Sequence, residues 1–177
     1  MRIRGSVVAA WLGLAIVHPW APGWGQSTVP NLVTVCDVLS KPLAFDGMSV
    51  RIRGRMVGTD EGSWLKGFDC PGVMKTDGYV WDSLISLDLP GNPLQIHQVD
   101  FEHDFAADQR LEQKYQPLRR KLPDRCIAFT YTGVFETRKE WQRMMNGNPR
   151  GFGHLNAAPG ALIIKSADEV APVPGCH

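Results

Sequence analysis

Apolar and polar residues alternate most strictly along the stretch 43–57. Apolar and arginine side chains fall on opposite sides of an extended chain there: Val50, Ile52 and Met56 on one side, and Arg51, Arg53 and Arg55 on the other. A period of two is the pattern of a strand with one face in a core and one face in water. The pair Asp46-Gly47 predicts a turn before this strand, and Gly54 predicts a bend within it.

Four later segments also carry strand patterns: 63–70, 79–89, 126–137 and 161–167. Pro71-Gly72 ends the first of these segments, and Pro90-Gly91 ends the second. Together with the stretch 43–57 they predict a mainly β protein of five strands. A long connection, 138–159, joins the last two strands.

Two segments predict helices. Residues 34–39 predict a short helical turn, since the threonine at its start can cap it and Pro42 stops its extension. Between the third and fourth strands, apolar residues recur at helical spacing in 100–121, which predicts an amphipathic helix. We expect Pro117 to end or kink this helix near Tyr115.

The entry into the first strand resembles that of OB-type barrel proteins. Lys-Pro-Leu-Ala-Phe-Asp-Gly at 41–47 and Val-Arg-Ile-Arg-Gly at 50–54 carry this resemblance. More narrowly, the chain is similar to a set of uncharacterised exported bacterial proteins that share this entry and a later Gly-Phe-Gly-His-Leu-Asn segment, here 151–156. The resemblance implies an exported, five-stranded OB-like β-barrel, with a short N-terminal helix and one helix between strands 3 and 4. It implies no catalytic residue.

The first 25 residues have the pattern of a signal peptide. Arg2 and Arg4 precede an apolar run at 6–17, and prolines and glycines follow it. The run is shorter than the roughly 20 residues that span a bilayer. We therefore expect residues 1–25 to be a signal peptide, residues 26–177 to form one domain without a transmembrane segment, and the protein to be secreted or periplasmic. Retention of the first segment as an anchor is the alternative.

Charge argues against nucleic acid as a partner. The chain of 177 residues has 19 basic and 18 acidic residues, and loss of Arg2 and Arg4 with the signal peptide leaves a net charge of −1. Such a domain has no overall positive field to attract a polyanion.

Export changes the interpretation of the cysteines, which are four in number: Cys36, Cys70, Cys126 and Cys176. An even number in an oxidising compartment favours disulfides, and the spacing is too wide for a structural zinc site. Three connectivities are compatible with the sequence. Cys176 is expected either to be free or to hold down the C-terminal tail.

Two polar groups are candidates for function outside the loops. Arg53 and Arg55, with Arg51, form a basic stripe that can bind a phosphate or carboxylate, or can pair with Asp82 and Asp88 on a neighbouring strand. The second group has metal-ligand chemistry: His97, Glu102 and His103. Acidic residues there are also typical of the first turn of a helix. We expect no metal and no cofactor, and keep these three residues as the candidates for a metal site.

The segment 151–156 is the strongest candidate for a binding loop. Its glycines allow close approach of a ligand, Phe152 offers a stacking surface, and His154 and Asn156 offer polar groups. In OB-folds the loop between the fourth and fifth strands flanks the binding face, together with the loop after the first strand, here 58–63. The alternative is that Phe152 closes the barrel and His154 satisfies backbone carbonyls.

These observations favour an exported, non-enzymatic binding or interaction module, whose partner is an unknown small ligand or envelope protein. A metal-dependent hydrolase centred on the region of His97 and His103 is one alternative, and a purely structural envelope protein is another. The sequence contains no nucleophile motif for an α/β-hydrolase.

Overall fold

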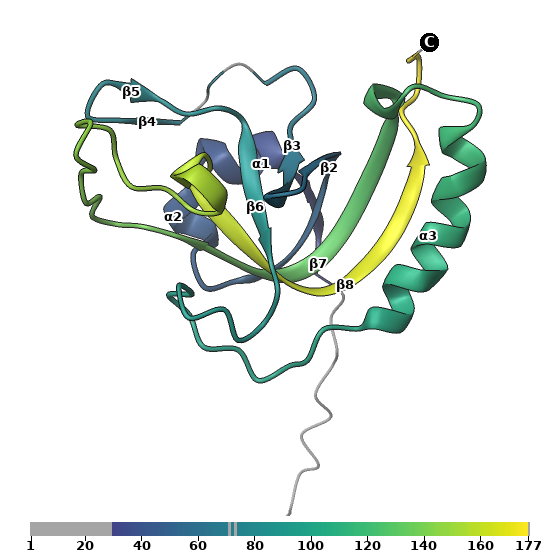
Figure 1. Ribbon diagram of the computed structural model, residues 1–177, viewed down its shortest axis with the longest axis horizontal. Helices are drawn as coiled ribbons and strands as arrows, with labels where there is room; N and C mark the ends of the chain where they lie inside the picture. Colours follow the sequence, from purple (N-terminus) through teal and green to yellow (C-terminus); the bar gives the residue numbers. More distant parts are fainter. Residues whose placement is uncertain (1–29, 71, 73, 177) are drawn as a thin grey trace, which may run out of the picture.

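A computed structural model describes residues 30–70, 72 and 74–176 (Figure 1). Within these ranges the protein is mainly β, with a mixed six-stranded sheet, a two-stranded sheet and three α-helices. The predicted signal peptide, 1–25, lies outside the described residues. Among the helices of the described ranges, none is long and apolar enough to cross a membrane.

The N-terminal elements are short and lie against the longest stretch predicted as a strand. Strand β1 (Leu32–Thr34) pairs in parallel with β2 (Ser49–Thr59). Helix α1 (Val35–Ser40) begins with a capping box, in which the backbone N–H of Asp37 donates to Thr34 Oγ1 at 3.1 Å. The predicted helical turn at 34–39 is therefore confirmed. Helix α1 ends at Ser40, before Pro42, as expected, and Pro42 opens a second short helix, α2 (Pro42–Phe45), where a proline at the first position loses no hydrogen bond.

Strand β2 changes partner at Gly54. Residues 49–54 pair with β7 (Ile127–Thr137), and residues 55–59 pair with β3 (Gly62–Lys66). A Cβ atom at Gly54 would lie 2.7 Å from Cγ of Leu65 and 2.9 Å from Cγ2 of Val35. The glycine is therefore needed because neighbouring elements approach its backbone too closely for a side chain.

The remaining pairings connect five strands in a cycle. Strand β3 pairs antiparallel with β6 (Leu84–Asp88), and β6 pairs in parallel with β8 (Gly160–Pro172). Strand β8 pairs antiparallel with β7, which returns to β2. The strands share one buried cluster, to which each contributes: Ile52, Leu65, Ile85, Phe129, Phe135 and Leu162.

The prediction of one continuous strand at 79–89 is wrong. It is divided into β5 (Tyr79–Val80), which pairs with β4 (Lys75–Thr76), and β6. Between β5 and β6, the Trp81 side chain is 1% exposed and its Nε1–H donates to Thr76 Oγ1 at 2.9 Å. Burial of this indole holds the connector off the line of the sheet, which explains the break.

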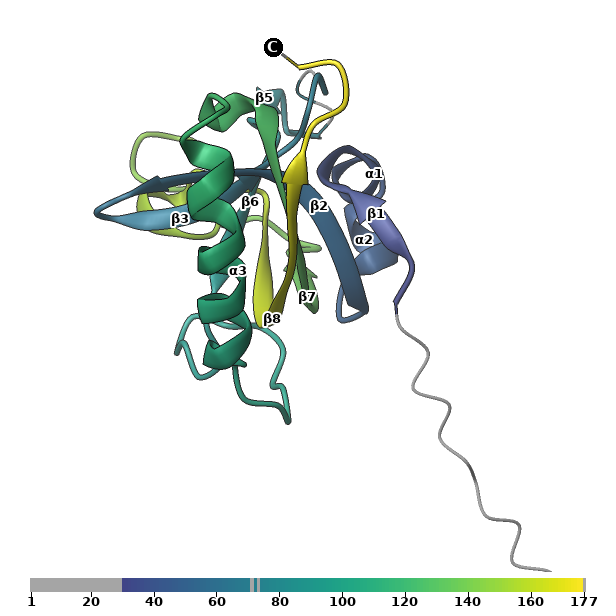
Figure 2. The ribbon, with the colours of Figure 1, turned by 90° about the vertical axis from the view of Figure 1, so that its right-hand side faces the viewer.

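Helix α3 (Phe105–Arg119) lies along β8, as Figures 1 and 2 both show. It falls between β6 and β7 in the chain, as predicted. Of the two effects expected of Pro117, an end or a kink near Tyr115, the end is wrong, because the helix continues to Arg119. The Tyr115 ring packs edge-on against Phe129 at 5.1 Å between centroids, and Leu118 packs against the buried cluster. These contacts hold the last turn in place despite the missing N–H of proline.

Two disulfides are present. Cys36–Cys70 joins α1 to the segment after β3, and Cys126–Cys176 joins the start of β7 to the C-terminal tail. The prediction of disulfides is confirmed, and of the two roles considered for Cys176 the structure has the one that holds down the tail.

Candidate functional site

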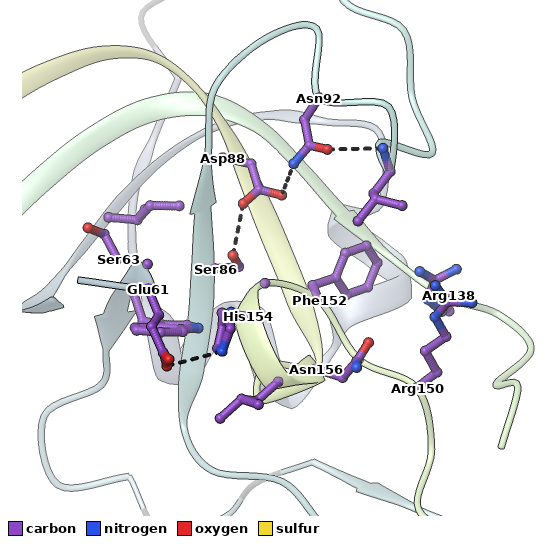
Figure 3. A pocket seen from close by; sticks show the side chains of 17 residues that line it. Glu61, Ser63, Ser86, Asp88, Asn92, Arg138, Arg150, Phe152, His154 and Asn156 are labelled. Atoms are coloured by element: carbon purple, nitrogen blue, oxygen red, sulfur yellow. Dashed lines mark hydrogen bonds and ion pairs between the residues drawn. The ribbon is translucent and has the colours of Figure 1, made fainter. Parts of the chain in front are cut away.

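A pocket of about 480 Å³ lies where β3, β6 and the connection between β7 and β8 meet (Figure 3). Three segments line it: Glu61–Trp64 from the β2–β3 turn and β3, Ser86–Leu94 from β6 and the loop after it, and Arg138–Asn156 from the long connection. Residues 58–63 and 138–159 were expected to flank one binding face. Both contribute to the lining of this pocket.

The segment 151–156 is closed on itself by backbone hydrogen bonds and lies close to β6. Phe152 N–H donates to the carbonyl of Ala158 at 2.8 Å, and Ala158 N–H donates back at 3.3 Å. Gly153 has φ of 69°, and a Cβ atom there would lie 2.6 Å from Oγ of Ser86. Leu155 and Asn156 also have positive φ, 57° and 54°. The strained backbone therefore brings the loop directly onto β6.

Phe152 contributes to the pocket mainly as a support. Its side chain is 5% exposed, and the Arg138 guanidinium carbon lies 4.7 Å from the centre of its ring. A cation over an aromatic face is attracted to it and loses freedom of movement. The ring thus fixes the position of Arg138, and little of it remains for direct stacking with a ligand.

His154 ties the loop to the β2–β3 turn. Its Nε2 lies 3.0 Å from Oε2 of Glu61, and the two side chains are 39% and 59% exposed. The histidine therefore pairs with a carboxylate rather than with the backbone carbonyls that the sequence had suggested as its alternative partners. Asn156 lines the same pocket and donates its backbone N–H to the carbonyl of Gly153 at 3.2 Å.

Two arginines lie together on one side of the pocket, Arg138 and Arg150 (Figure 3). Within the described part of the chain, neither guanidinium forms an ion pair or hydrogen bond with a carboxylate. Burial lowers the pKa of Arg138 from its ordinary value, the nearby charge of Arg150 lowers it further, and the charge of Glu136 opposes both. Two neighbouring guanidinium groups without a carboxylate at ion-pairing distance have donors suited to an anion.

Asp88 is the acidic group at the end of β6. Its carboxylate accepts a hydrogen bond from Ser86 Oγ at 2.9 Å and a long one from Asn92 Nδ2 at 3.5 Å (Figure 3). Burial raises the pKa of Asp88, and the bond from Ser86 opposes that change. The carboxylate retains free acceptor positions, because an ionised carboxylate has about four.

Sequence reasoning missed most of the charged lining. Arg138 directly follows the predicted strand 126–137, and Arg150 directly precedes the segment 151–156. Their positions at the two ends of the candidate loop were the available signal. Trp64, which is 7% exposed, also lines the pocket, and its Nε1 has no hydrogen-bond partner among the described residues.

Arg53 and Arg55 do not line this pocket. Arg55 lines a separate cavity of about 380 Å³ beside Cys176. Arg51 pairs with Asp168 on β8 at 2.8 Å, rather than with Asp82 or Asp88, because β7 and β8 lie on that side of β2. The basic stripe and the loop 151–156 are therefore not brought together in one site.

The candidate metal ligands are engaged in separate interactions. Nε2 of His97 lies 2.8 Å from Asp46, and Nε2 of His103 lies 2.6 Å from Asp108. Glu102 is exposed. Among the residues that the structure describes, no three histidine, cysteine or acidic side chains are arranged to hold a metal ion.

No family model, curated protein or solved structure matches the chain. Its function therefore has to follow from the geometry of the pocket.

Proposed function

We propose that the chain is an exported, non-enzymatic binding module with an OB-like barrel, and that the pocket at Trp64, Ser86 and His154 is its ligand site. The observation that carries this proposal is the place of the pocket in the fold. Counted in chain order, the five strands of the cycle are β2, β3, β6, β7 and β8. The pocket lies on the second and third, β3 and β6, between the β2–β3 turn and the β7–β8 connection. OB-folds bind their ligands at this place.

The barrel itself is supported by the pairings. Strands β2, β3, β6, β8 and β7 form a closed cycle, in which β6 and β8 are parallel and every other pair is antiparallel. Helix α3 lies between the third and fourth strands of this cycle in the chain. A five-stranded Greek-key barrel has this kind of closed order.

Export is supported by the disulfides. All four cysteines are joined in two bridges. Disulfides persist in oxidising compartments and are rare in the cytosol. A secreted or periplasmic location, after removal of residues 1–25, is the setting in which these bridges are stable.

The pocket has the properties of a small-molecule site. Its volume of about 480 Å³ falls within the range of roughly 300–1,000 Å³ that is usual for such sites. Aromatic rings, hydroxyls, carboxylates and guanidinium groups converge on it, so it can orient a ligand by several polar contacts.

A small-molecule screen followed by NMR tests this proposal. The reporter is the indole N–H signal of Trp64, identified by its loss in Trp64→Phe. Compounds that bind are expected to shift this signal, and His154→Ala is expected to weaken their binding about tenfold, the effect of one charge-assisted contact. His97→Ala, which changes a histidine outside the pocket, is the matched control and should leave binding unchanged.

If no compound shifts the Trp64 signal, whether the compound is cationic, neutral or anionic, the pocket is not a small-ligand site. A purely structural envelope protein would give that result.

A further inference from the structure

The arginine pair of the pocket has unmet bonding capacity. Arg138 and Arg150 lie side by side in Figure 3, and the charge of Arg150 adds to burial in lowering the pKa of Arg138. Several other arginines of this fold form ion pairs with carboxylates. Arg143 lies 3.0 Å from Asp77, and Arg51 lies 2.8 Å from Asp168. Within the described ranges neither Arg138 nor Arg150 has a carboxylate at ion-pairing distance, and the charge of Glu136 only partly offsets their repulsion, so an external anion would relieve the rest.

The position of Arg138 is fixed in advance. Its guanidinium lies over the ring of Phe152, and its Nε is buried without a hydrogen-bond partner in the described part of the protein. An ordered guanidinium loses little freedom when an anion binds, and its planar set of donors matches a carboxylate. Arg150 is exposed and can adjust to the same ligand.

The other side of the pocket can accept hydrogen bonds from donors on a ligand. Asp88 has free acceptor positions beside Ser86 and Asn92. Glu61, the second acid of the lining, is already paired with His154. A ligand that reaches from the arginines to Asp88 therefore needs an anionic group at one end and hydroxyl or ammonium donors at the other.

We infer that the pocket binds a small carboxylate that also carries hydroxyl groups, of the kind represented by a sugar acid. Its carboxylate is held by Arg138 and Arg150, and its hydroxyls face Asp88, Ser86 and Asn92. This inference rests on the proposed function, since it names the class of ligand for the same site.

The charge of the lining favours a carboxylate over a phosphate. The described lining contains two arginines and two acids, Glu61 and Asp88, so its formal charge is zero when His154 is neutral. A lining of zero net charge offers no net Coulomb attraction for a second negative charge, whereas the cost of desolvating an anion rises steeply with its charge, so a singly charged carboxylate is favoured over a doubly charged phosphate. A polyanion such as nucleic acid carries still more negative charge and is disfavoured for the same reason.

Three probes with one ring system test the inference: glucuronate, glucose and glucose 6-phosphate. They differ in bearing a carboxylate, a neutral hydroxymethyl group or a phosphate at the same carbon. Each is titrated into the disulfide-intact chain while the Trp64 indole signal is followed. Glucuronate is expected to bind roughly 10- to 100-fold more tightly than glucose, the effect of charge-assisted hydrogen bonds to a carboxylate. It should also bind more tightly than glucose 6-phosphate.

The variant Arg150→Met removes one charge at an exposed position and keeps most of the length of the side chain. It is expected to reduce the preference for glucuronate over glucose about tenfold or more. Arg143→Met, in the same connection but outside the pocket, is the matched control and should keep the preference. Arg138→Lys keeps the charge and loses the planar donors, so it should also lower glucuronate affinity.

The outcomes separate this inference from the proposed function. If the screen gives ligands but glucose binds as tightly as glucuronate, or Arg150→Met keeps the full preference, the pocket is a binding site and the carboxylate assignment is wrong. Failure of glucuronate to bind, or tighter binding of glucose 6-phosphate, also overturns the assignment. If no compound of any charge shifts the Trp64 signal, the proposed function fails as well.

Discussion

Gly153 shows how single residues set the shape of the pocket. It combines a φ of 69° with a close approach to Oγ of Ser86, where a Cβ atom would lie at 2.6 Å. Gly147, in the same connection, has a φ of 81°, but a Cβ atom there would have no neighbour within 4 Å among the described residues. The two glycines therefore share a positive φ and differ in what a side chain would contact.

Gly153→Ala is expected to destabilise the chain more than Gly147→Ala does. Both variants carry the penalty of a positive φ, roughly 1–2 kcal/mol. The first also places a side chain in a region that is essentially reserved for glycine, because ψ of Gly153 is −173°, and it pushes the loop off β6. Urea unfolding of both variants measures the difference. Equal losses in free energy would show that the loop is not pressed onto Ser86.

Glu136 is a carboxylic acid in the interior of the fold. Its side chain is fully buried, and its Oε2 accepts hydrogen bonds from the backbone N–H groups of Ile96, at 2.8 Å, and His97, at 3.2 Å. Burial raises its pKa above the ordinary value of 4.5, although these bonds oppose the change. The folded chain therefore holds this proton more tightly than the unfolded chain does.

This shift predicts a pH dependence of stability. The contribution of protonated Glu136 is fully present below about pH 4.5 and is lost as the pH rises through the raised pKa of the folded state. Relative to wild type, Glu136→Gln should gain free energy of unfolding across that window, by at most about 1.4 kcal/mol per unit of pKa shift. Urea unfolding at several pH values measures this gain.

The matched control is Glu169→Gln, which changes an exposed carboxylate on β8. It should run parallel to wild type at every pH. A Glu136→Gln curve that also stays parallel to wild type would show that ionisation of Glu136 costs nothing in the folded state.

Among the elements, the two disulfides hold the ends of the described chain. Cys36–Cys70 spans 34 residues and fixes α1, and Cys126–Cys176 spans 50 and fixes the C-terminal tail. Closed loops of these lengths each stabilise the fold by about 4 kcal/mol in the chain-entropy model. The stabilisation from the two bridges is thus comparable with the whole free energy of unfolding of a small domain.

Replacing either cysteine pair by alanines is expected to lower the free energy of unfolding by several kcal/mol, because the unfolded chain regains the freedom that the bridge removed. Urea unfolding of the two double variants measures this. Unchanged stability of Cys126→Ala/Cys176→Ala would show that the tail is not held by its bridge.

The main elements follow from the sequence because their patterns are periodic. Val50, Ile52 and the residues that alternate with them predict β2, and the four-residue spacing around Tyr115 predicts α3. The break between β5 and β6 was not predictable, since burial of Trp81 depends on Thr76 and the neighbouring hairpin. The continuation of α3 past Pro117 was not predictable either, because it depends on the packing of Tyr115 and Leu118 against the core.

The candidate site was predictable only in part, for a physical reason. Loop composition drew attention to Phe152, His154 and Asn156, and these residues do line one pocket. Arg138 and Arg150 are single positions in an irregular connection, and no period marks them. Their juxtaposition, 12 positions apart in the numbering, arises only when the loop folds back onto the sheet.

For the whole molecule, the cycle of five strands explains why distant segments meet. The β2–β3 turn, the end of β6 and the β7–β8 connection are far apart in the chain and line one pocket. The sheet positions these segments, and their irregular backbones supply the charged and aromatic groups. In the function that we propose, this pocket binds a small ligand through its arginine pair.

Titration of glucuronate against wild type and Arg150→Met, with the Trp64 indole signal as reporter, tests this claim most directly. The structure predicts a saturable shift in wild type and an affinity roughly tenfold or more lower in the variant. Equal affinity in the two proteins, or no shift of Trp64 in wild type, would contradict it.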